Sequence, residues 1–531
     1  MPKVVCSVTD KRGLVPFCKF LVEEYQFEIY ASGGTYQHLA ENGIAVRSVQ
    51  ELSGNPEAFG GRMKTISFPL LSGILFRRDH SDDVKQAQEL NIAPIDMVIC
   101  NLYPFEQVAQ RENVTLSDLI ENIDIGGPLL LRAAAKNYHW VAVVSDPDDY
   151  TVVQEALKKH QGQVPLTLRH HLALKVWSYT SWYDSVIFHC LGNLENKMIP
   201  SSFHQWPLGF KKLQELRYGE NPHQRAIWFE TSEYIKGNRS PIFSVLQGKE
   251  LSYNNLLDVD AVIRILKDLH VHFPHFYSTV VVKHTIPCGL TCGEDLEGVF
   301  LDAWNQDPVS RFGGIIGIKG RVTASIAKCL TEVFVEVVVA SDFDADALAI
   351  FAQKPNIRLL KISDRLMAEG GVTHEYRTIL GGVLWQDSDN KFFSELQSVT
   401  VQEFPKKLEP LARFGEIAVK HFKSNALVVV DYIPNGSGFR LVAAGSGQPN
   451  RVDVLRLLIG SRLSVVSLSS SALLVSEAFF PFPDIIEEAK KLNINYIVQP
   501  GGSRQDSLVI QRANELGLVM AFSQVRHFRH G

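Results

Sequence analysis

The sequence predicts an α/β protein that contains more than one domain. From the N-terminus to about residue 195, short apolar runs alternate with helical stretches, which is typical of parallel βαβ units. A further apolar run at residues 280–282 ends directly in Lys283 and His284, and we expect Pro287 and Gly289 to turn the chain after it. The length of 531 residues is large for one hydrophobic core and indicates roughly two to four domains.

The composition is that of an ordinary globular protein and argues against several kinds of partner. Hydrophobic residues make up 45% of the chain, charged residues make up 21%, and the formal net charge is −5. This charge gives no general attraction to nucleic acids or anionic membranes, so any phosphate binding must be local. The seven cysteines are scattered and odd in number, and we find no signal-peptide or membrane-spanning run. We therefore expect a cytoplasmic protein that binds neither nucleic acid nor a membrane.

Three segments near the N-terminus are suited to phosphate binding. The segment SGGT places two glycines between an expected strand and an expected helix, where backbone N–H groups can approach an anion. Taken alone, such a turn is explained equally well as a tight connection with a Ser or Thr cap. Three segments of this kind on one scaffold favour a phosphate site. The residues concerned are Ser7, Lys11, Ser32, Gly33, Gly34, Thr35, Arg62 and Thr65.

Further polar side chains in the same part of the chain suggest proton chemistry. Asn101 and Tyr103 follow an expected buried strand, Asp124 precedes a glycine pair, and Lys136 ends the apolar helix after that pair. Together with Lys64, the tyrosine, the aspartate and Lys136 suit polarisation of a carbonyl group and movement of protons without a metal.

The Lys283–His284 pair is the second candidate for chemistry. A lysine at the end of a buried strand can stabilise a developing oxyanion, and a histidine can carry a proton near neutral pH. The pair alone is explained as well by an ordinary strand end with a surface lysine. Whether the pair is catalytic therefore has to be judged from the sequence motifs around it.

Those motifs resemble a known family along the whole chain. SGGT, GGRMKT, NLYPF, DIGG and LLRAAAKN are similar to the landmarks of an IMP cyclohydrolase domain, which begins the bifunctional AICAR transformylase/IMP cyclohydrolase family. LRYGENPHQRA, VVKHTIPCG, KSNA, SEAFFPFPD and VRHFRH follow in the order of that family's transformylase domain. The chain is thus identified as a member of this family.

The resemblance implies a domain arrangement. It predicts a methylglyoxal-synthase-like domain at residues 1–195, in which helices sandwich a parallel sheet. A connector at residues 196–214 leads to an α/β transformylase domain at residues 215–531, which contains two cytidine-deaminase-like subdomains. It also implies a homodimer whose transformylase sites combine residues of both chains.

The resemblance also implies two reactions. In the first, a formyl group moves from the co-substrate 10-formyltetrahydrofolate to the amine of AICAR, with His284 as general base or acid and Lys283 supporting the developing charge. In the second, formyl-AICAR closes its ring to IMP with loss of water, and the implied catalytic residues are Lys64, Tyr103, Asp124 and Lys136. Beyond Asn101 and the phosphate segments, the residues implied in substrate binding are Arg217, Tyr218, Phe312, Asn425, Gln448, Arg451, Phe479, Asp484 and Arg526. Ordinary core packing explains Phe479 nearly as well.

No metal is expected at either site. Cys288 and Cys292 follow His284 as cysteines do in zinc deaminases, but that chemistry requires H-x-E and two residues between the cysteines. Here Ile286 stands in place of the glutamate and three residues separate the cysteines. We therefore expect both cysteines to be packing residues.

Several positions depart from the family pattern. In the N-terminal half, Ser67 and Leu71 stand where histidines are usual, Phe68 stands where a proline is usual, and Arg12 replaces a threonine. The departures in the other half are Ile286, Arg311, Ser446, Asn450, Glu477 and Pro483. We favour a bifunctional enzyme. The alternatives are a transformylase with an impaired cyclohydrolase half and a catalytically weak, nucleotide-binding regulatory homologue.

Overall fold

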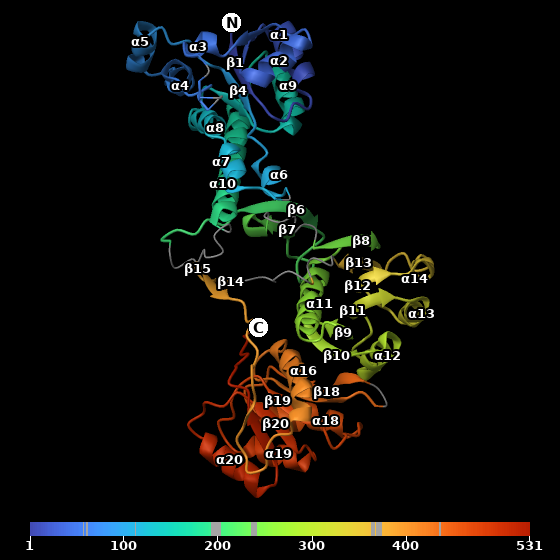
Figure 1. Ribbon diagram of the computed structural model, residues 1–531. Coiled ribbons are helices and arrows are strands. Elements are labelled where there is room, and N and C mark those ends of the chain that lie inside the picture. Colours follow the sequence, from blue (N-terminus) through green and yellow to red (C-terminus); the bar gives the residue numbers. More distant parts are fainter. Residues whose placement is uncertain are drawn as a thin grey trace. The chain divides into compact units, whose positions relative to one another are not determined.

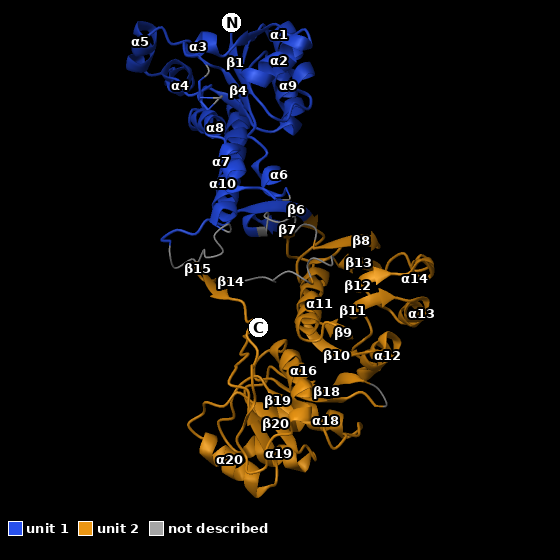
Figure 2. Cartoon of the chain, viewed as in Figure 1, with its two compact units in different colours: residues 1–214, 229–240 blue, residues 215–228, 241–531 orange. Residues whose placement is uncertain are grey.

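The computed structural model describes residues 1–56, 58–59, 62–111, 113–192, 203–234, 242–362, 367, 374–434 and 437–530 (Figure 1). The glycine pair at residues 60–61 and residues 196–202 of the expected connector lie outside the described residues. The chain divides into two compact units: unit 1 is residues 1–214 with 229–240, and unit 2 is residues 215–228 with 241–531 (Figure 2). The domain boundaries expected at residues 195 and 214 stay a prediction. No described helix is both long and apolar enough to cross a membrane.

Unit 1 is built on a parallel sheet with the strand order β3-β2-β1-β4-β5. The strands read as continuous apolar runs because helices pack against the sheet and bury it, as is usual for parallel sheets. The parallel βαβ units expected from the sequence are thus confirmed. The strands are β1 (Lys3–Ser7), β2 (Glu28–Ala31), β3 (Val46–Ser48), β4 (Met97–Cys100) and β5 (Ala142–Val144).

The longest helix described in unit 1 is α10, which packs against α8 and β5. It buries Trp182, Tyr183 and Val186 in the core. The helices of this unit are α1 (Leu14–Tyr25), α2 (Gly33–Glu41), α3 (Gln50–Ser53), α4 (Phe68–Leu75), α5 (Ser81–Glu89), α6 (Phe105–Ala109), α7 (Leu116–Glu121), α8 (Gly126–Lys136), α9 (Tyr150–Lys159) and α10 (Leu166–Gly192).

In the described part of unit 2, the main sheet has the order β16-β21-β20-β19-β17-β18-β10-β9-β11-β12-β13-β8. Its strands are β8 (Phe243–Gln247), β9 (Tyr277–Lys283), β10 (Ile286–Gly293), β11 (Ile315–Val322), β12 (Val337–Phe343), β13 (Arg358–Ile362), β16 (Gln397–Ser398), β17 (Leu427–Tyr432), β18 (Gly438–Gly445), β19 (Leu473–Ser476), β20 (Tyr496–Gln499) and β21 (Val519–Phe522). The α-helices are α11 (Tyr253–His272), α12 (Leu296–Gln306), α13 (Ala324–Glu332), α14 (Ala345–Phe351), α16 (Glu409–Lys420), α17 (Arg451–Asp453), α18 (Gly460–Leu463), α19 (Asp484–Lys491) and α20 (Asp506–Glu515). Two two-stranded sheets lie outside this sheet: β6 (Phe210–Leu216) with β7 (Ala226–Thr231), which both units share, and the antiparallel hairpin of β14 (His374–Ile379) and β15 (Gly382–Asp387).

This sheet contains a topological repeat, although the sequence shows no internal repeat. In one half, the β9–β10 hairpin is followed by β11, β12 and β13; β11 is antiparallel to β9, and the last three strands are parallel. In the other half, the β17–β18 hairpin and β19, β20 and β21 repeat this pattern. Antiparallel pairing of β10 with β18 joins the halves. The repeat agrees with the two subdomains expected of this region.

The turn after β9 differs from the sequence-based expectation. The chain turns at His284 and Thr285, with φ angles of 55° and 63°, whereas Pro287 and Gly289 lie inside β10. A two-residue hairpin with two positive φ angles matches the twist of its strands and needs no proline. Pro287 is tolerated because it adjoins a bulge. Gly289 permits close packing, since a Cβ there would lie 2.2 Å from the carbonyl oxygen of Ala303 in α12.

Candidate active sites

The first candidate site lies where the parallel strands of unit 1 end, because their carboxyl ends meet at one end of the sheet. Ser7 ends β1 and Ser32 follows β2, and their hydroxyl oxygens lie 3.0 Å apart. Thr35 accepts a hydrogen bond from the N–H of Val8 at 3.0 Å and donates one to the Val8 carbonyl at 3.1 Å. These contacts connect the first two phosphate-suited segments.

Asn101 holds the loop between β1 and α1. Its Oδ1 accepts hydrogen bonds from the N–H groups of Thr9 (2.7 Å) and Asp10 (2.9 Å), and its Nδ2 donates to the Asp10 carbonyl at 3.0 Å. The amide of Asn101 therefore shapes the loop that carries Lys11, which is half-buried. These contacts give Asn101 a supporting role, and the substrate contact expected from the sequence stays a prediction.

The third phosphate-suited segment approaches two helix N-termini. A Cβ placed on Gly33, at the start of α2, would lie 3.5 Å from Nζ of Lys64. A Cβ on Gly126, at the start of α8, would lie 2.5 Å from Oγ1 of Thr65. Glycine at residue 126 thus allows Thr65 to approach the N–H groups of α8, which favour an anion.

Asp124 lies just before α8 in a partly buried position. Its Oδ1 accepts a hydrogen bond from the N–H of Gly127 at 2.8 Å. Burial raises the pKa of the Asp124 carboxyl, and hydrogen bonds from nearby N–H groups, first that of Gly127, oppose the rise. A carboxyl with a raised pKa can exchange a proton closer to neutrality than an exposed aspartate can.

Two tyrosines of α10, which the sequence analysis missed, hold the loops of this site. The hydroxyl of Tyr183 accepts a hydrogen bond from the N–H of Asp124 at 2.8 Å, and that of Tyr179 accepts one from Leu102 at 3.1 Å. Burial raises the pKa of Tyr179 to about 12 and also raises the pKa of Tyr183, so both remain protonated. Their spacing of four residues on an apolar helix was the available signal.

Three other expected residues of unit 1 have exposed side chains. Lys136 is exposed at the far end of α8, and that helix separates it from Asp124 by about 15 Å. Arg62 forms an exposed ion pair with Glu121. The side chain of Tyr103 is exposed.

The departures in unit 1 have structural partners. Ser67 is buried and caps α4, because its hydroxyl accepts the N–H of Leu70 at 3.3 Å. Phe68 is exposed and Leu71 packs partly against the core. The backbone N–H of Arg12 donates to Asp10 at 3.0 Å and its side chain pairs with Asp10 at 2.8 Å. These contacts, first that of the N–H, lower the pKa of Asp10, so the added positive charge is compensated locally.

The second candidate site lies at one end of the main sheet of unit 2. The strand register places the end of β9, the start of β11, the start of β17 and the ends of β18, β19 and β21 on this end. Several of the expected transformylase residues, among them Lys283, Phe312 and Asn425, stand next to these strand ends. Sheet pairing therefore places them on the same end of the sheet, although they are far apart in sequence.

The Lys283–His284 turn is held from two directions. Nζ of Lys283 donates to the carbonyl of Phe312 at 2.6 Å, and Phe312, just before β11, has an exposed ring. The N–H of Thr285 donates to Oδ1 of Asp258 in α11 at 2.6 Å. Burial raises the pKa of Asp258, and the N–H groups of Thr285 and His284 oppose the rise. His284 itself is exposed, so its imidazole is accessible to a substrate.

A second group, which we call the Arg451 cluster, consists of Asn425, Arg451, Glu477 and Phe479. Arg451 donates to Oδ1 of Asn425 (3.1 Å), to Oε1 of Glu477 (2.8 Å) and to the carbonyl of Phe479 (2.9 Å). Asn425 donates to the carbonyls of Gln448 (3.0 Å) and Pro449 (3.1 Å). Arg451 is 8% exposed and Glu477 is fully buried, and Nε of Arg451 and Oε2 of Glu477 have no hydrogen-bond partner in the described structure.

Arg217, Asp484 and Arg526 lie on the surface or at helix starts. The Arg217 guanidinium lies 5.5 Å from the ring centre of the half-buried Tyr218, and that of Arg526 lies 4.2 Å from the ring centre of Phe528. Both arginines are exposed and can reach a ligand. Asp484 begins α19, where its carboxylate accepts the N–H of Ile485 at 2.9 Å.

Three departures in unit 2 also have structural roles. Arg311 donates to the carbonyl of Trp304 at 3.1 Å and to Asn305 at 2.9 Å, so it is fastened to the end of α12. Asn450 caps α17 by accepting the N–H of Asp453 at 2.8 Å. Pro483 occupies the position before α19. For Ser446 the structure gives no explanation.

The cysteines near His284 pack in different cores. The bulge in β10 turns Cys288 toward the helices α12 and α13, while Cys292 is buried with α11 on the other face of the sheet. Burial raises the pKa of Cys288 to about 12 and raises that of Cys292, so both are thiols at neutral pH. Among the described residues, no group of three His, Cys, Asp or Glu side chains is placed to hold a metal.

The fold and these two sites define a class of protein: a two-site α/β enzyme, one site suited to an anionic ligand and the other built around a Lys–His turn. Residues 13–129 match the family model of the MGS-like domain, and residues 134–460 match that of the AICARFT/IMPCHase bienzyme. The chain is 42% identical to the bifunctional purine biosynthesis protein PurH of Persephonella marina, 38% to that of Caldicellulosiruptor bescii and 40% to that of Aquifex aeolicus, over at least 99% of each chain.

The chain belongs to the AICARFT/IMPCHase bienzyme family. The methylglyoxal-synthase-like fold expected of its N-terminal part is confirmed. Family membership at this coverage supports the bifunctional interpretation, with 10-formyltetrahydrofolate as formyl donor, and not the impaired or regulatory alternatives.

Proposed function

We propose that unit 2 transfers a formyl group from 10-formyltetrahydrofolate to AICAR and that unit 1 closes formyl-AICAR to IMP. The observation that carries this proposal is the Lys283–His284 turn, held between Phe312 and Asp258 at the end of the sheet where the Arg451 cluster also lies. Unit 1 contributes a separate set of polar groups around Asp124. Because each unit has its own group of polar residues, the two units are suited to catalyse formyl transfer and ring closure in succession.

For formyl transfer, His284 removes a proton from the amine of AICAR as the amine attacks the formyl carbon. The imidazole is exposed on a two-residue turn and can approach a bound amine. Lys283 supplies positive charge beside the oxygen on which negative charge develops. The exposed guanidinium groups of Arg217 and Arg526 are suited to the phosphate, since an arginine can donate two parallel hydrogen bonds.

For ring closure, the carboxamide nitrogen attacks the formyl carbon of the same molecule, so orientation supplies much of the acceleration. Asp124, whose pKa is raised by burial, removes a proton from the nitrogen and returns one as water leaves. Lys64 and the N–H groups at the start of α8 stabilise the oxyanion. Ser7, Ser32 and Thr35 lie at the strand ends where the phosphate is expected.

The test supplies each substrate separately to the purified protein. With AICAR and 10-formyltetrahydrofolate, IMP should appear. Accumulation of formyl-AICAR would instead support the transformylase with an impaired cyclohydrolase, and binding without turnover would support the regulatory homologue. Lys136→Ala should slow the closure of supplied formyl-AICAR and spare formyl transfer. Unchanged ring closure in that variant would remove Lys136 from the site.

We also propose a homodimer with composite transformylase sites. Within one chain, β10 and β18 separate β9 from β17, so the strands that carry Lys283 and Asn425 lie about 14 Å apart. The β14–β15 hairpin presents four exposed apolar residues that a second chain would cover: Ile379, Leu380, Val383 and Leu384. Both observations support assembly of the complete site from two copies.

Mixing of two inactive variants tests the composite site. His284→Ala and Arg526→Ala chains should each be nearly inactive, and random mixing should restore roughly a quarter of wild-type activity if the two residues come from different chains. Mixed dimers that remain inactive would place both residues in one chain's site. An active monomer in sedimentation at assay concentration would contradict the dimer itself.

The protein is further proposed to work in the cytoplasm, on small-molecule substrates. All seven cysteines are free thiols, as is usual in a reducing compartment. Cell fractionation should recover it with soluble cytoplasmic markers, and recovery with the membrane fraction would contradict this assignment.

A further inference from the structure

The last segment of the described chain, residues 523–530, carries Arg526 and alternates between buried and exposed side chains. Residues 523, 525 and 527 are buried, whereas residues 524, 526 and 528 are exposed. Successive side chains of an extended segment point to opposite sides. The groups that hold the buried set therefore determine the direction in which Arg526 points, and a slip of one residue would reverse it.

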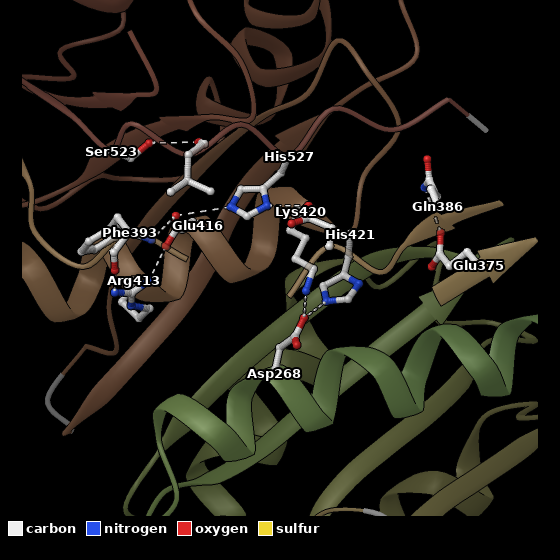
Figure 3. Close-up of polar contacts among 12 residues, drawn as sticks. Asp268, Glu375, Gln386, Phe393, Arg413, Glu416, Lys420, His421, Ser523 and His527 are labelled. Atoms are coloured by element: carbon white, nitrogen blue, oxygen red, sulfur yellow. Dashed lines mark hydrogen bonds and ion pairs between the residues drawn. The ribbon is translucent and has the colours of Figure 1, made fainter. Parts of the chain in front are cut away.

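His527 is the strongest anchor of this buried set. Its Nδ1 lies 2.7 Å from Oδ2 of Asp389 and its Nε2 lies 3.3 Å from Oε1 of Glu416, and the residue is 2% exposed. Figure 3 shows the ring between the C-terminal segment and Glu416 of α16. Because a carboxylate only accepts, both ring nitrogens must donate, which requires the imidazolium form. Burial lowers the pKa of His527, but the hydrogen bonds and charges of the two carboxylates raise it to about 9.

Glu416 is itself fixed, so it can serve as a rigid support. Its Oε1 accepts the N–H of Phe393 at 2.9 Å, and its Oε2 pairs with Arg413 at 2.6 Å, on the same helix (Figure 3). Its carboxylate is almost completely buried. The ring of His527 lies against Oε1, the oxygen that also accepts from Phe393.

The main chain around His527 connects to both loops of the Arg451 cluster. The N–H of His527 donates to the carbonyl of Glu477 at 2.9 Å, and Glu477 holds Arg451. The carbonyl of Arg529 accepts the N–H of Ser424 at 2.9 Å and its hydroxyl at 2.7 Å, directly before Asn425. Movement of this segment would therefore displace groups on several strand ends together.

We propose that His527 is a positioning residue for formyl transfer, which bridges Asp389 and Glu416 and thereby fixes the segment that presents Arg526 to the nucleotide. This inference rests on the proposed transformylase function of unit 2. His527 itself does not touch the substrate. Its effect is transmitted through the direction of Arg526 and through the contacts of the segment with Glu477 and Ser424.

The competing explanation is a buried histidine that stabilises only the fold. Loss of such a residue lowers the fraction of folded enzyme, which reduces kcat and leaves KM unchanged. Loss of a positioning residue weakens substrate binding in the folded enzyme, so KM for AICAR rises. Ring closure in unit 1 serves as an internal measure of the concentration of folded, active protein.

The experiment compares four variants in the full-length protein. His527→Ala removes both donors, His527→Asn keeps a donor near the position of Nδ1, and His527→Gln keeps one near the position of Nε2. His530→Ala, an exposed histidine of the same segment, is the control. KM for AICAR should rise about tenfold or more in His527→Ala, less in the Asn and Gln variants, and not in the control, with ring closure unchanged.

The outcome separates this inference from the proposed function. If the wild-type protein forms no formyl-AICAR, the transformylase function fails. If the wild type is active and His527→Ala keeps its KM for AICAR, or loses only kcat together with ring closure, then His527 is a stabilising residue and the inference is overturned. A Glu416→Gln variant that raises KM in the same way would support the bridge.

Discussion

Replacement of Tyr183 by phenylalanine isolates one hydrogen bond in the ring-closure site. The hydroxyl of Tyr183 accepts the N–H of Asp124 at 2.8 Å. Phenylalanine keeps the ring, which packs at 6.2 Å from Phe105, and removes only this acceptor. The N–H of the residue that carries the proposed acid–base group is then left without its partner, in a partly buried loop.

The size of the effect follows from the unsatisfied donor. Leaving such a group unpaired costs about 1–3 kcal/mol. If the loop that carries Asp124 shifts to give its N–H another partner, ring closure should slow by about ten- to a hundredfold. Displacement of a reacting group by about an ångström has effects of that size. Formyl transfer, which we assign to unit 2, should be unchanged.

The assay measures IMP formation from supplied formyl-AICAR, with urea unfolding measured on the same sample. The matched control is Tyr25→Phe, because Tyr25 ends α1 at the opposite end of the sheet and also packs against the core. A Tyr183→Phe protein that loses 1–3 kcal/mol of unfolding free energy, as estimated above, but keeps its rate of ring closure would refute the reasoning. Tyr183 would then stabilise the loop without positioning Asp124.

Three other outcomes are expected. His284→Ala should lower formyl transfer by roughly a hundred- to ten-thousandfold and leave ring closure intact, and loss of both in a folded protein would contradict separate sites. Hydrogen bonds and charges of Asp389 and Glu416 raise the pKa of His527 to about 9 against the effect of burial, and Lys420, Asp268 and Arg529 line the same pocket. The contribution of His527 to stability should therefore be complete below about pH 6.5 and lost as pH rises through about 9. Urea unfolding of the wild type and His527→Ala should therefore converge at high pH, and a constant difference would contradict the charged bridge. Prolonged chelation should leave formyl transfer intact, and zinc lost together with activity would show that a metal had been missed.

Much of the fold was predictable because the local hydrophobic pattern and the motifs shared with the family indicate the same structure. The alternation of apolar runs and helical stretches predicts parallel units, and unit 1 has them. The run at residues 280–282 is a central strand with both faces buried, and it ends at Lys283 as expected. The turn was placed wrongly because Pro287 and Gly289 are strong turn formers, whereas the actual turn uses His284 and Thr285 at positive φ, which residue type seldom predicts.

In the candidate sites, the sequence indicated the residues expected to react but not the residues that support them. Residue type and order indicated His284, Asp124 and the exposed arginines, because a reaction needs particular chemical groups. The supporting residues Tyr183 and His527 could not be recognised, because their partners lie 59 and 111 residues away for Asp124 and Glu416, respectively. Sequence spacing carries no information about such contacts.

The sequence by itself determined which chemical groups the protein has and the family to which it belongs, since these depend on residue identity and order alone. The tertiary structure decided what each group is free to do. Arg451 is an arginine suited to phosphate by type, and in the structure it is buried and donates to Glu477 and Asn425, so its contact with a substrate stays a prediction. Cys288 and Cys292 are close in sequence, yet because of the bulge in β10 their side chains lie on opposite faces of the sheet. Direction and burial are properties of packing, and packing is set by contacts between residues that the linear order keeps far apart.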